Sequence, residues 1–259
     1  MKDKFIPGIY NYCDRWCERC TFPSRCRNYE NTSQLKPEQL DMNNKAFWDN
    51  LSSNFDKALK LLQKAAKKHG IDINKSMSKE EEQAYEERES FLRKAAKQHP
   101  LSKLCTGYRK AVLPFFKNEV SSELVDKTRE LVSHLHMGIQ TEEEVAHTMA
   151  NLGDCEEIIR WYVFFIDAKL QRALHGKIEG EDWELDNGYP KDSDGSAKIA
   201  VIAVEKSMAA WTRMYELLPS CEDAALQALS LLIQIKRKAL EEFPECMAFK
   251  RPGFDEVLE

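Results

Sequence analysis

The sequence predicts an all-α protein, and three observations lead to that prediction. The chain has 259 residues with only 10 glycines and 9 prolines, which is below average usage. Apolar residues recur every three or four positions over long segments, the spacing of one helical face, rather than alternating as in a strand. Capping signals recur between these segments. We expect a bundle of about seven or eight helices over residues 37–259, preceded by a cysteine-rich segment over residues 1–36.

Composition and charge narrow the class of protein. Hydrophobic residues make up 42% of the chain and charged residues 31%, and 38 basic against 43 acidic side chains give a formal charge of −5. This is the composition of a soluble globular protein, and it excludes disordered and collagen-like chains. No apolar run approaches the roughly 18 residues of a membrane span, and the first residues have no secretory h-region. We therefore expect a cytoplasmic protein with no membrane partner.

A first long helix is expected after a linker over residues 28–43. Apolar side chains follow one helical face, and the pattern ends near Gly70. The opposite face carries a lysine stripe. Because the next helix begins with glutamates and the chain is acidic, we interpret the stripe as a charge match or a solvated face, and nucleic acid is disfavoured as a partner. The face comprises Phe47, Leu51, Phe55, Leu59, Leu62 and Ala66, and the stripe Lys57, Lys60, Lys64, Lys67 and Lys68.

Helix-start and helix-stop signals place the next three helices. Ser78 and Glu81 have the spacing of a capping box, in which a hydroxyl and a carboxylate bond to the unpaired amides at a helix start. Pro100 suits the first position of the following helix, which Pro114 should kink or end. Another helix is expected to close at Gly138.

The last helices are predicted to be the most buried part of the molecule. We expect a short helix from Thr141 and a longer one from Asp154 to about residue 176. The segments 158–166 and 199–204 are apolar on almost all sides, which is typical of a core. The acidic connection over residues 177–194 is interpreted as a solvated loop. A final buried face comprises Leu226, Leu229, Leu232, Ile233 and Leu240.

The eight cysteines divide into two groups. Four lie within fourteen residues, as Cys13-x3-Cys17-x2-Cys20-x5-Cys26. Four thiolates so close together need a cation or an iron–sulfur cluster to neutralise them, and four ligands is the number that tetrahedral zinc or a cubane cluster takes. The others are scattered through predicted helices and are interpreted as small buried hydrophobes. These are Cys105, Cys155, Cys221 and Cys246.

The surroundings of the clustered cysteines suit an anionic centre, because aromatic and basic side chains interleave them. The stretch CERCTFPSRC, ten residues long, resembles the cysteine element of iron–sulfur nucleases and helicase-type enzymes. That resemblance implies a [4Fe–4S] cluster, and a single tight run of cysteines also favours a cluster over Zn²⁺, whose sites are usually built from two separated pairs. Zinc and free thiols stay open as alternatives. The interleaving residues are Tyr10, Tyr12, Trp16, Phe22, Arg15, Arg19, Arg25 and Arg27.

The first three cysteines also match the spacing of radical S-adenosylmethionine enzymes. Those enzymes resemble one another in having an aromatic residue before the last cysteine, where this chain has Arg19. They also need a β/α barrel, which the rest of the chain does not predict. We therefore set this interpretation aside.

A second metal site is suggested by Glu144-x-x-His147, which places a carboxylate and an imidazole on one helical face, as in ferritin-like di-iron proteins. Such a site needs a second pair and two further carboxylates, for which Glu157, Asp167 and Glu205 are candidates. Asp167 and Glu205 lie amid apolar neighbours, where an acid needs a partner. Ordinary ion-pair partners would be Arg160, Lys169, Arg172 or Lys198.

The same glutamates also have a structural interpretation. Thr141 and Glu144 have the spacing of a capping box, and Asp154 and Glu157 have that spacing too. Both carboxylates would then serve helix starts instead of a metal.

Three functional hypotheses follow from the sequence. The first is a metal-binding helical protein, with an iron–sulfur centre and a binding or redox role toward a protein or redox partner. The second is a non-haem di-iron carboxylate oxidoreductase. The third is a zinc-stabilised helical interaction scaffold. Phosphate-binding loops, nucleophile elbows and zinc-protease motifs do not occur, so the sequence specifies no substrate or reaction.

Overall fold

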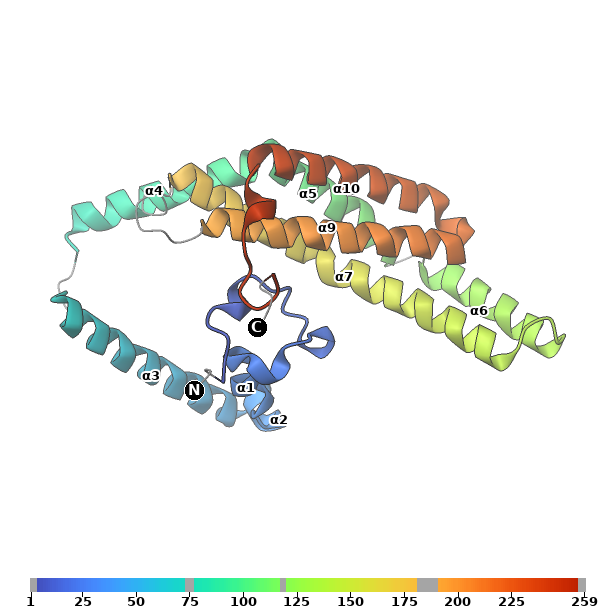
Figure 1. Cartoon of the computed structure of the whole chain (residues 1–259), viewed down its shortest axis with the longest axis horizontal. Coiled ribbons are helices and arrows are strands. Elements are labelled where there is room, and N and C mark those ends of the chain that lie inside the picture. Colours follow the sequence, from blue (N-terminus) through green and yellow to red (C-terminus); the bar gives the residue numbers. More distant parts are fainter. Residues whose placement is uncertain (1–3, 73–76, 117–119, 181–190, 256–259) are drawn as a thin grey trace. The chain divides into compact units, whose positions relative to one another are not determined.

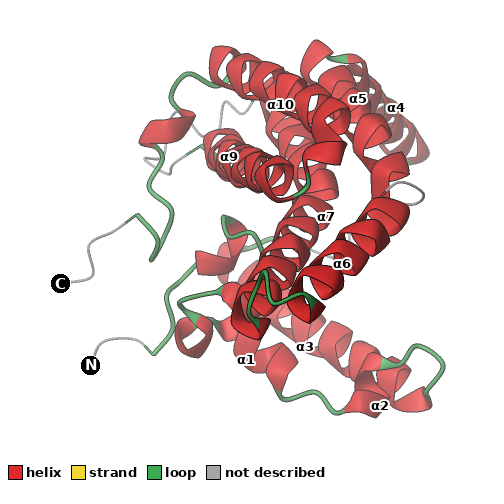
Figure 2. Cartoon of the chain, turned by 90° about the vertical axis from the view of Figure 1, so that its right-hand side faces the viewer, coloured by secondary structure: helices red, strands yellow, loops and turns green. Residues whose placement is uncertain are grey.

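The computed structural model describes residues 4–72, 77–116, 120–180 and 191–255. Over these ranges the chain forms nine α-helices and no strand, so the predicted all-α fold is confirmed (Figure 2). None of the helices described is both long and apolar enough to cross a membrane. The helices are α1 (Arg27–Ser33), α2 (Pro37–Leu40), α3 (Lys45–His69), α4 (Lys79–Gln98), α5 (Pro100–Pro114), α6 (Val120–His136), α7 (Glu142–Glu179), α9 (Asp192–Leu217) and α10 (Glu222–Glu242).

The chain divides into two compact units. The first comprises Met1–Asn11 and Arg15–Ser90, and the second comprises Tyr12–Asp14 and Phe91–Glu259. The first unit therefore extends well past residue 36, where the sequence suggested a boundary. The helical bundle belongs to the second unit, together with three residues of the cysteine segment.

Four helices form the bundle of the second unit. Helix α9 packs against α7 and α10, and α5 packs against the same two helices, so the four close a ring (Figure 1). Helix α6 packs against α7. The indole N–H of Trp211 donates to the hydroxyl of Tyr108 over 3.2 Å in the middle of this core. Both side chains are fully buried, so the bond satisfies polar groups that burial would otherwise leave unpaired.

Small residues explain why α9 can occupy the interior. Nearly every residue from 195 to 204 is buried, as the sequence predicted for 199–204. Their short side chains let the backbones of neighbouring helices approach, and this stretch of the helix is therefore buried on almost all sides. The small buried residues are Gly195, Ser196, Ala197, Ala200, Ala203, Ser207 and Ala210.

Several predicted helix ends are confirmed by their capping geometry. The Ser78 amide donates to the Glu81 carboxylate over 2.8 Å, and the Glu81 amide donates back to the Ser78 hydroxyl over 3.2 Å. Pro100 is the first residue of α5. Gly70 and Gly138 follow α3 and α6 with φ of 68° and 69°, a left-handed conformation that favours glycine.

Two predictions of helix extent are wrong. Residues 28–43 are not a plain linker, because they contain most of α1 and all of α2. Residues 142–179 form one continuous helix, so Asp154 does not begin a helix and no capping box lies there. A glycine inside a helix, such as Gly153, lowers the stability of the helix by about 1 kcal/mol relative to alanine. The neighbouring Leu152 and Cys155 are buried, and their packing keeps the helix intact through the glycine.

Two predicted core faces are also corrected. In α10, Leu226 and Ile233 are exposed, and the buried positions are mostly alanines. Trp161 and Phe164 of α7 are exposed as well, although their segment is apolar almost all round. Close packing selects small side chains at helix contacts, so the largest apolar residues do not mark the contact face. The buried residues of α10 are Ala225, Ala228, Leu232, Ile235 and Ala239.

The predicted acidic loop over residues 177–194 is only partly described. Its first residues belong to α7 and its last to α9, while residues 181–190 lie outside the described ranges.

Candidate functional site

Tight turns shape the cysteine segment in the first unit. A 3₁₀ turn spans Cys17–Arg19, and the Cys20 amide closes it by donating to the Cys17 carbonyl over 3.2 Å. A second turn spans Pro23–Arg25, and the Cys26 amide donates to the Pro23 carbonyl over 3.2 Å. Cys20 and Cys26 thus each end a turn, and Cys26 also precedes α1.

The sulfur of Cys20 already accepts a backbone hydrogen bond. The Phe22 amide donates to Cys20 Sγ over 3.3 Å. A backbone N–H aimed at a sulfur is the contact that supports and tunes thiolate ligands in iron–sulfur proteins.

Basic and aromatic residues surround the turns, as the sequence suggested. The guanidinium of Arg19 lies 4.0 Å from the ring centre of Trp16, which is buried. The guanidinium of Arg27 lies 4.9 Å from the ring centre of Phe5. The Ile6 amide donates to the Arg25 carbonyl over 3.0 Å and closes the segment on itself. Positive charge beside the thiols suits an anionic centre.

Asp14, which belongs to the second unit, binds side chains of the bundle. Its carboxylate accepts from the Tyr162 hydroxyl over 2.7 Å and from the Lys206 ammonium over 2.9 Å. Its carbonyl accepts from the Trp161 indole over 3.1 Å. Lys206 also lies 3.0 Å from the Tyr162 hydroxyl, so the three side chains form one network between α7 and α9.

Tyr12, two residues earlier, docks beside it. Its hydroxyl donates to Asp192 over 3.0 Å, and Arg172 holds the same carboxylate by two bonds of 2.6 and 2.8 Å. The centre of the Tyr12 ring lies 4.6 Å from the centre of the Phe249 ring. A Cβ on Gly195 would lie 2.4 Å from the Tyr12 ring, so this close approach requires glycine.

A buried lysine fixes the segment that carries Phe249. Lys198 donates to the Phe249 carbonyl over 2.6 Å and pairs with Asp255 over 2.7 Å. The Arg251 guanidinium binds Asp255 as well, and its hydrogen bonds hold the pKa of that carboxyl well below the ordinary value. The buried ammonium is thereby paired, as its burial demands.

Cys13 lies between the two docked residues Tyr12 and Asp14, and it belongs to the second unit. Arg15 follows with a φ of 57°, a left-handed conformation unusual for a residue with a side chain. Cys17, Cys20 and Cys26 belong to the first unit. No sequence signal indicated the contacts of Asp14, Tyr162 and Lys206, because these contacts join distant parts of the chain.

The two groups of cysteines differ in exposure. The four N-terminal thiols are half-buried, and all eight cysteines are free of disulfides. The four scattered cysteines are buried, as predicted. Burial raises the pKa of Cys105 to about 12 and that of Cys221 and Cys246 to about 11, and it also raises the pKa of Cys155. Such thiols stay protonated at neutral pH and are inert as ligands.

A metal site at the four N-terminal cysteines requires both suitable donor atoms and a suitable arrangement of them. The donor set suits iron–sulfur clusters and zinc. Over the described ranges, however, no three side chains of His, Cys, Asp or Glu are grouped closely enough to hold a metal ion.

The residues suggested for a di-iron site are not brought together. Glu144 is exposed and forms the predicted capping box, in which its carboxylate accepts from the Thr141 amide over 2.8 Å and its amide donates to the Thr141 hydroxyl over 3.2 Å. His147 and Glu157 are exposed on α7. Glu205 is exposed too, contrary to its apolar neighbours in sequence, and pairs with Lys236 over 2.8 Å. The inward-facing ligand set that such a site needs is absent from the described residues.

Asp167 is largely buried, as expected, but its partner differs from those considered. Arg109 of α5 binds one carboxylate oxygen over 2.8 Å. The other oxygen is buried with no hydrogen-bond partner among the described residues. The partner of Asp167 therefore comes from α5, which packs against α7, and not from a neighbouring position on α7 itself.

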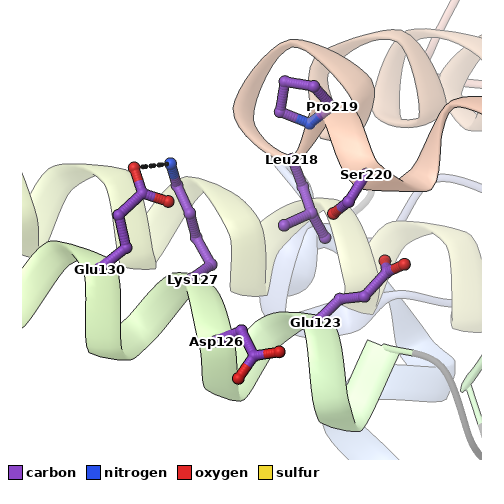
Figure 3. Close-up of a pocket in the computed structure, with 7 residues that line it drawn as sticks. All are labelled: Glu123, Asp126, Lys127, Glu130, Leu218, Pro219 and Ser220. Carbon is purple, nitrogen blue, oxygen red and sulfur yellow. Dashed lines mark hydrogen bonds and ion pairs between the residues drawn. The ribbon is translucent and has the colours of Figure 1, made fainter.

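A surface pocket of about 310 Å³ lies in the second unit, between α6 and the turn after α9 (Figure 3). Lys127 and Glu130 form an ion pair of 2.9 Å at one side, and Leu218 and Pro219 form the apolar side. None of the residues predicted to form a site lines this pocket.

Comparison of the chain with protein-family models, with curated proteins and with solved structures found no match, so its own residues carry the functional argument.

Proposed function

We propose that this chain is a metal-binding helical protein in which Cys13, Cys17, Cys20 and Cys26 hold an iron–sulfur cluster, with a binding or redox role. The observation that carries the proposal is the separation of the cysteines into two groups. Four thiols within fourteen residues are half-buried, whereas the other four are buried and their pKa values are raised by burial. Packing in the bundle accounts for the second group, and the donor chemistry of four closely spaced thiols favours a metal centre for the first.

Local contacts support the same proposal. Cys20 accepts a backbone N–H, and Arg19 and Arg27 lie nearby on aromatic rings. Four thiolates and iron leave a net negative centre, which N–H dipoles and guanidinium groups stabilise. Metal binding would then contribute to the stability of this segment, as it does in small metal-binding segments.

Metal content tests the proposal. Full-length protein purified without oxygen should contain iron and acid-labile sulfide in equal amounts and absorb visible light. The variant Cys17→Ser/Cys20→Ser should lose both, while the control Cys155→Ala, which alters a buried thiol of the bundle, should keep them. Protein that contains zinc and no sulfide would contradict the cluster and support a zinc-stabilised scaffold instead. Wild-type protein free of metal, or a serine variant with undiminished metal, would refute the ligand assignment.

Thiol counting gives an independent readout. In metal-free folded protein, an alkylating reagent should reach the four N-terminal cysteines and spare the four buried ones. Bound metal should protect the N-terminal group, and this protection should vanish on chelation. Equal labelling of both groups in folded protein would contradict the separation on which the proposal rests.

A further inference from the structure

The joint between α4 and α5 is a single residue, His99. Helix α4 ends at Gln98 and α5 begins at Pro100. The Ser102 hydroxyl of α5 donates to the Ala96 carbonyl of α4 over 2.6 Å, and both residues are buried. The two helices are thus held close together across the joint, and the His99 side chain lies among a fixed set of neighbours in the second unit.

One ring nitrogen of His99 caps α5. The Leu101 amide donates to His99 Nδ1 over 3.3 Å. Pro100 has no N–H, so Leu101 carries the first amide of the helix, and this residue is fully buried. A ring nitrogen accepts a hydrogen bond only when it carries no proton, so the capping imidazole is neutral and has its proton on Nε2. A charged ring has a proton on both nitrogens and cannot form this cap.

The other ring nitrogen of His99 lies near a carboxylate. His99 Nε2 is 3.6 Å from Glu242 Oε1, which is too long for a hydrogen bond but close enough for an ion pair with a charged ring. Glu242 is the last residue of α10 and also binds the ammonium of Lys238 over 3.0 Å and that of Lys177 over 2.8 Å. The side chains of His99 and Glu242 are 22% and 19% exposed, so water screens their interaction only in part.

Charged groups act on the ring from both helices that pack against α5, namely α7 and α10. Burial is the main cause that lowers the pKa of His99. The Glu242 carboxylate raises that pKa, and the ammonium groups of Lys238 and Lys177 lower it. The ring is therefore mainly neutral at neutral pH, in the form that the cap needs, and it becomes charged in more acidic solution.

We propose that His99 is a pH-sensitive joint, whose neutral ring caps α5 and whose charged ring gives up the cap and pairs with Glu242. Only the neutral ring can accept at Nδ1, so protonation breaks one contact while it strengthens the other. The hydrogen bond between Ser102 and Ala96 contains no group that titrates in this range, so α4 and α5 stay joined while the first turn of α5 opens. This inference is independent of the metal proposal, since it uses no cysteine.

Nuclear magnetic resonance of the full chain tests both states of the ring. Nitrogen chemical shifts at about pH 7.5 should show the His99 proton on Nε2. Between about pH 7.5 and about pH 5, the protection of the Leu101 amide against hydrogen exchange should fall at least about tenfold, after correction for the intrinsic pH dependence of exchange. The amide of Leu232, in the buried middle of α10, is the internal reference and should keep its protection. A proton on Nδ1 at the higher pH, or Leu101 protection that does not fall relative to Leu232, would overturn the inference.

A variant that keeps the cap without titrating separates the cap from other effects of acid. Asparagine caps helices through its side-chain oxygen and gains no proton in this range, so His99→Asn should protect the Leu101 amide equally at both pH values. His99→Ala should leave this amide weakly protected at both. The matched control His134→Asn replaces a half-buried histidine of α6, bonded to Gln140, and should respond to pH as wild type does. A wild-type response in His99→Asn would show that another group controls the joint, and the inference would be wrong.

Discussion

The hydroxyl of Tyr162 donates a 2.7 Å hydrogen bond to the carboxylate of Asp14, which lies 148 positions earlier in the chain. Tyr162 is fully buried in α7, so Asp14 is bonded to the core of the bundle. Lys206 of α9 joins the same carboxylate. The residue beside Cys13 is thus held by two helices of the bundle.

Removing the Tyr162 hydroxyl should loosen this attachment. A hydrogen bond to a charged acceptor contributes about 1.5–3 kcal/mol, so Tyr162→Phe should lower the free energy of unfolding by about that amount. Denaturant titration measures the loss, and alkylation of Cys13 should become faster. The control Tyr215→Phe removes the hydroxyl of an exposed tyrosine and should change stability by less than about 0.5 kcal/mol. Equal effects of the two changes would contradict the attachment.

Gly195→Ala should displace the Tyr12 ring. The new Cβ would lie 2.4 Å from that ring and 2.7 Å from the ring of Phe249, so the segment must shift. Overpacking of this kind costs about 1–3 kcal/mol. Gly153→Ala makes the same change inside α7, where nothing lies within 4 Å, and should stabilise the helix by up to about 1 kcal/mol. Thermal unfolding should therefore shift in opposite directions, and a shared direction would disprove the close approach.

Breaking the pair of Arg109 and Asp167 should be costly because it leaves a largely buried carboxylate without its cation. We expect Arg109→Leu to destabilise the bundle by about 3 kcal/mol. Arg109→Leu/Asp167→Leu should recover most of that loss, since it also removes the charge. The exposed pair of Arg213 and Glu216 provides the control, and Arg213→Leu should cost less than about 1 kcal/mol. A double variant no better than the single one would argue against this account.

The pH dependence of stability should report on Glu242. A hydrogen bond from Lys177 is the main cause that lowers its pKa from 4.5 to about 2, against the opposing effect of burial, and Lys238 and His99 add to the lowering. A carboxyl with a depressed pKa in the folded protein contributes stability above its ordinary pKa, and that contribution is lost as pH falls from about 4.5 toward 2. Burial lowers the pKa of His99, so the folded state binds this proton less readily than the unfolded state does. The free energy of unfolding therefore also declines as the pH falls below the ordinary pKa of 6.5.

Glu242→Gln should therefore flatten the acid limb of the stability curve and cost about 1–2 kcal/mol at pH 7. Urea titrations at several pH values measure both effects. Glu205→Gln, which breaks an exposed ion pair with Lys236, should leave the slope nearly unchanged. Parallel acid limbs for wild type and Glu242→Gln would show that this carboxylate does not control the transition.

Much of the helical architecture could be predicted because its signals are local. The capping box at Ser78, the first position at Pro100 and the terminal Gly138 all act within one turn of chain. The prediction failed at Asp154, where an equally good box lies inside α7. A cap forms only where the preceding turn is absent, and packing of the flanking residues decides that.

The candidate site divides in the same way. The spacing of Cys13, Cys17, Cys20 and Cys26 predicts a metal site, which stays a prediction. Periodicity predicts burial of the scattered cysteines, and their burial is confirmed. The partners of Asp14 and Asp167 did not follow, because each comes from a helix far away in the chain. Glu205 had apolar neighbours in sequence and nevertheless lies in water.

The helical class, most helix ends and the burial of the scattered cysteines could be predicted from the sequence, since they depend on spacing and on bonds between residues a few positions apart. The buried helical faces, the docking of Asp14 between α7 and α9, and the exposure of the apolar side of α3 within its unit could be seen only in the folded chain. Those outcomes depend on the shapes of surfaces brought together by the whole fold, and periodicity carries no information about the shape of a distant partner.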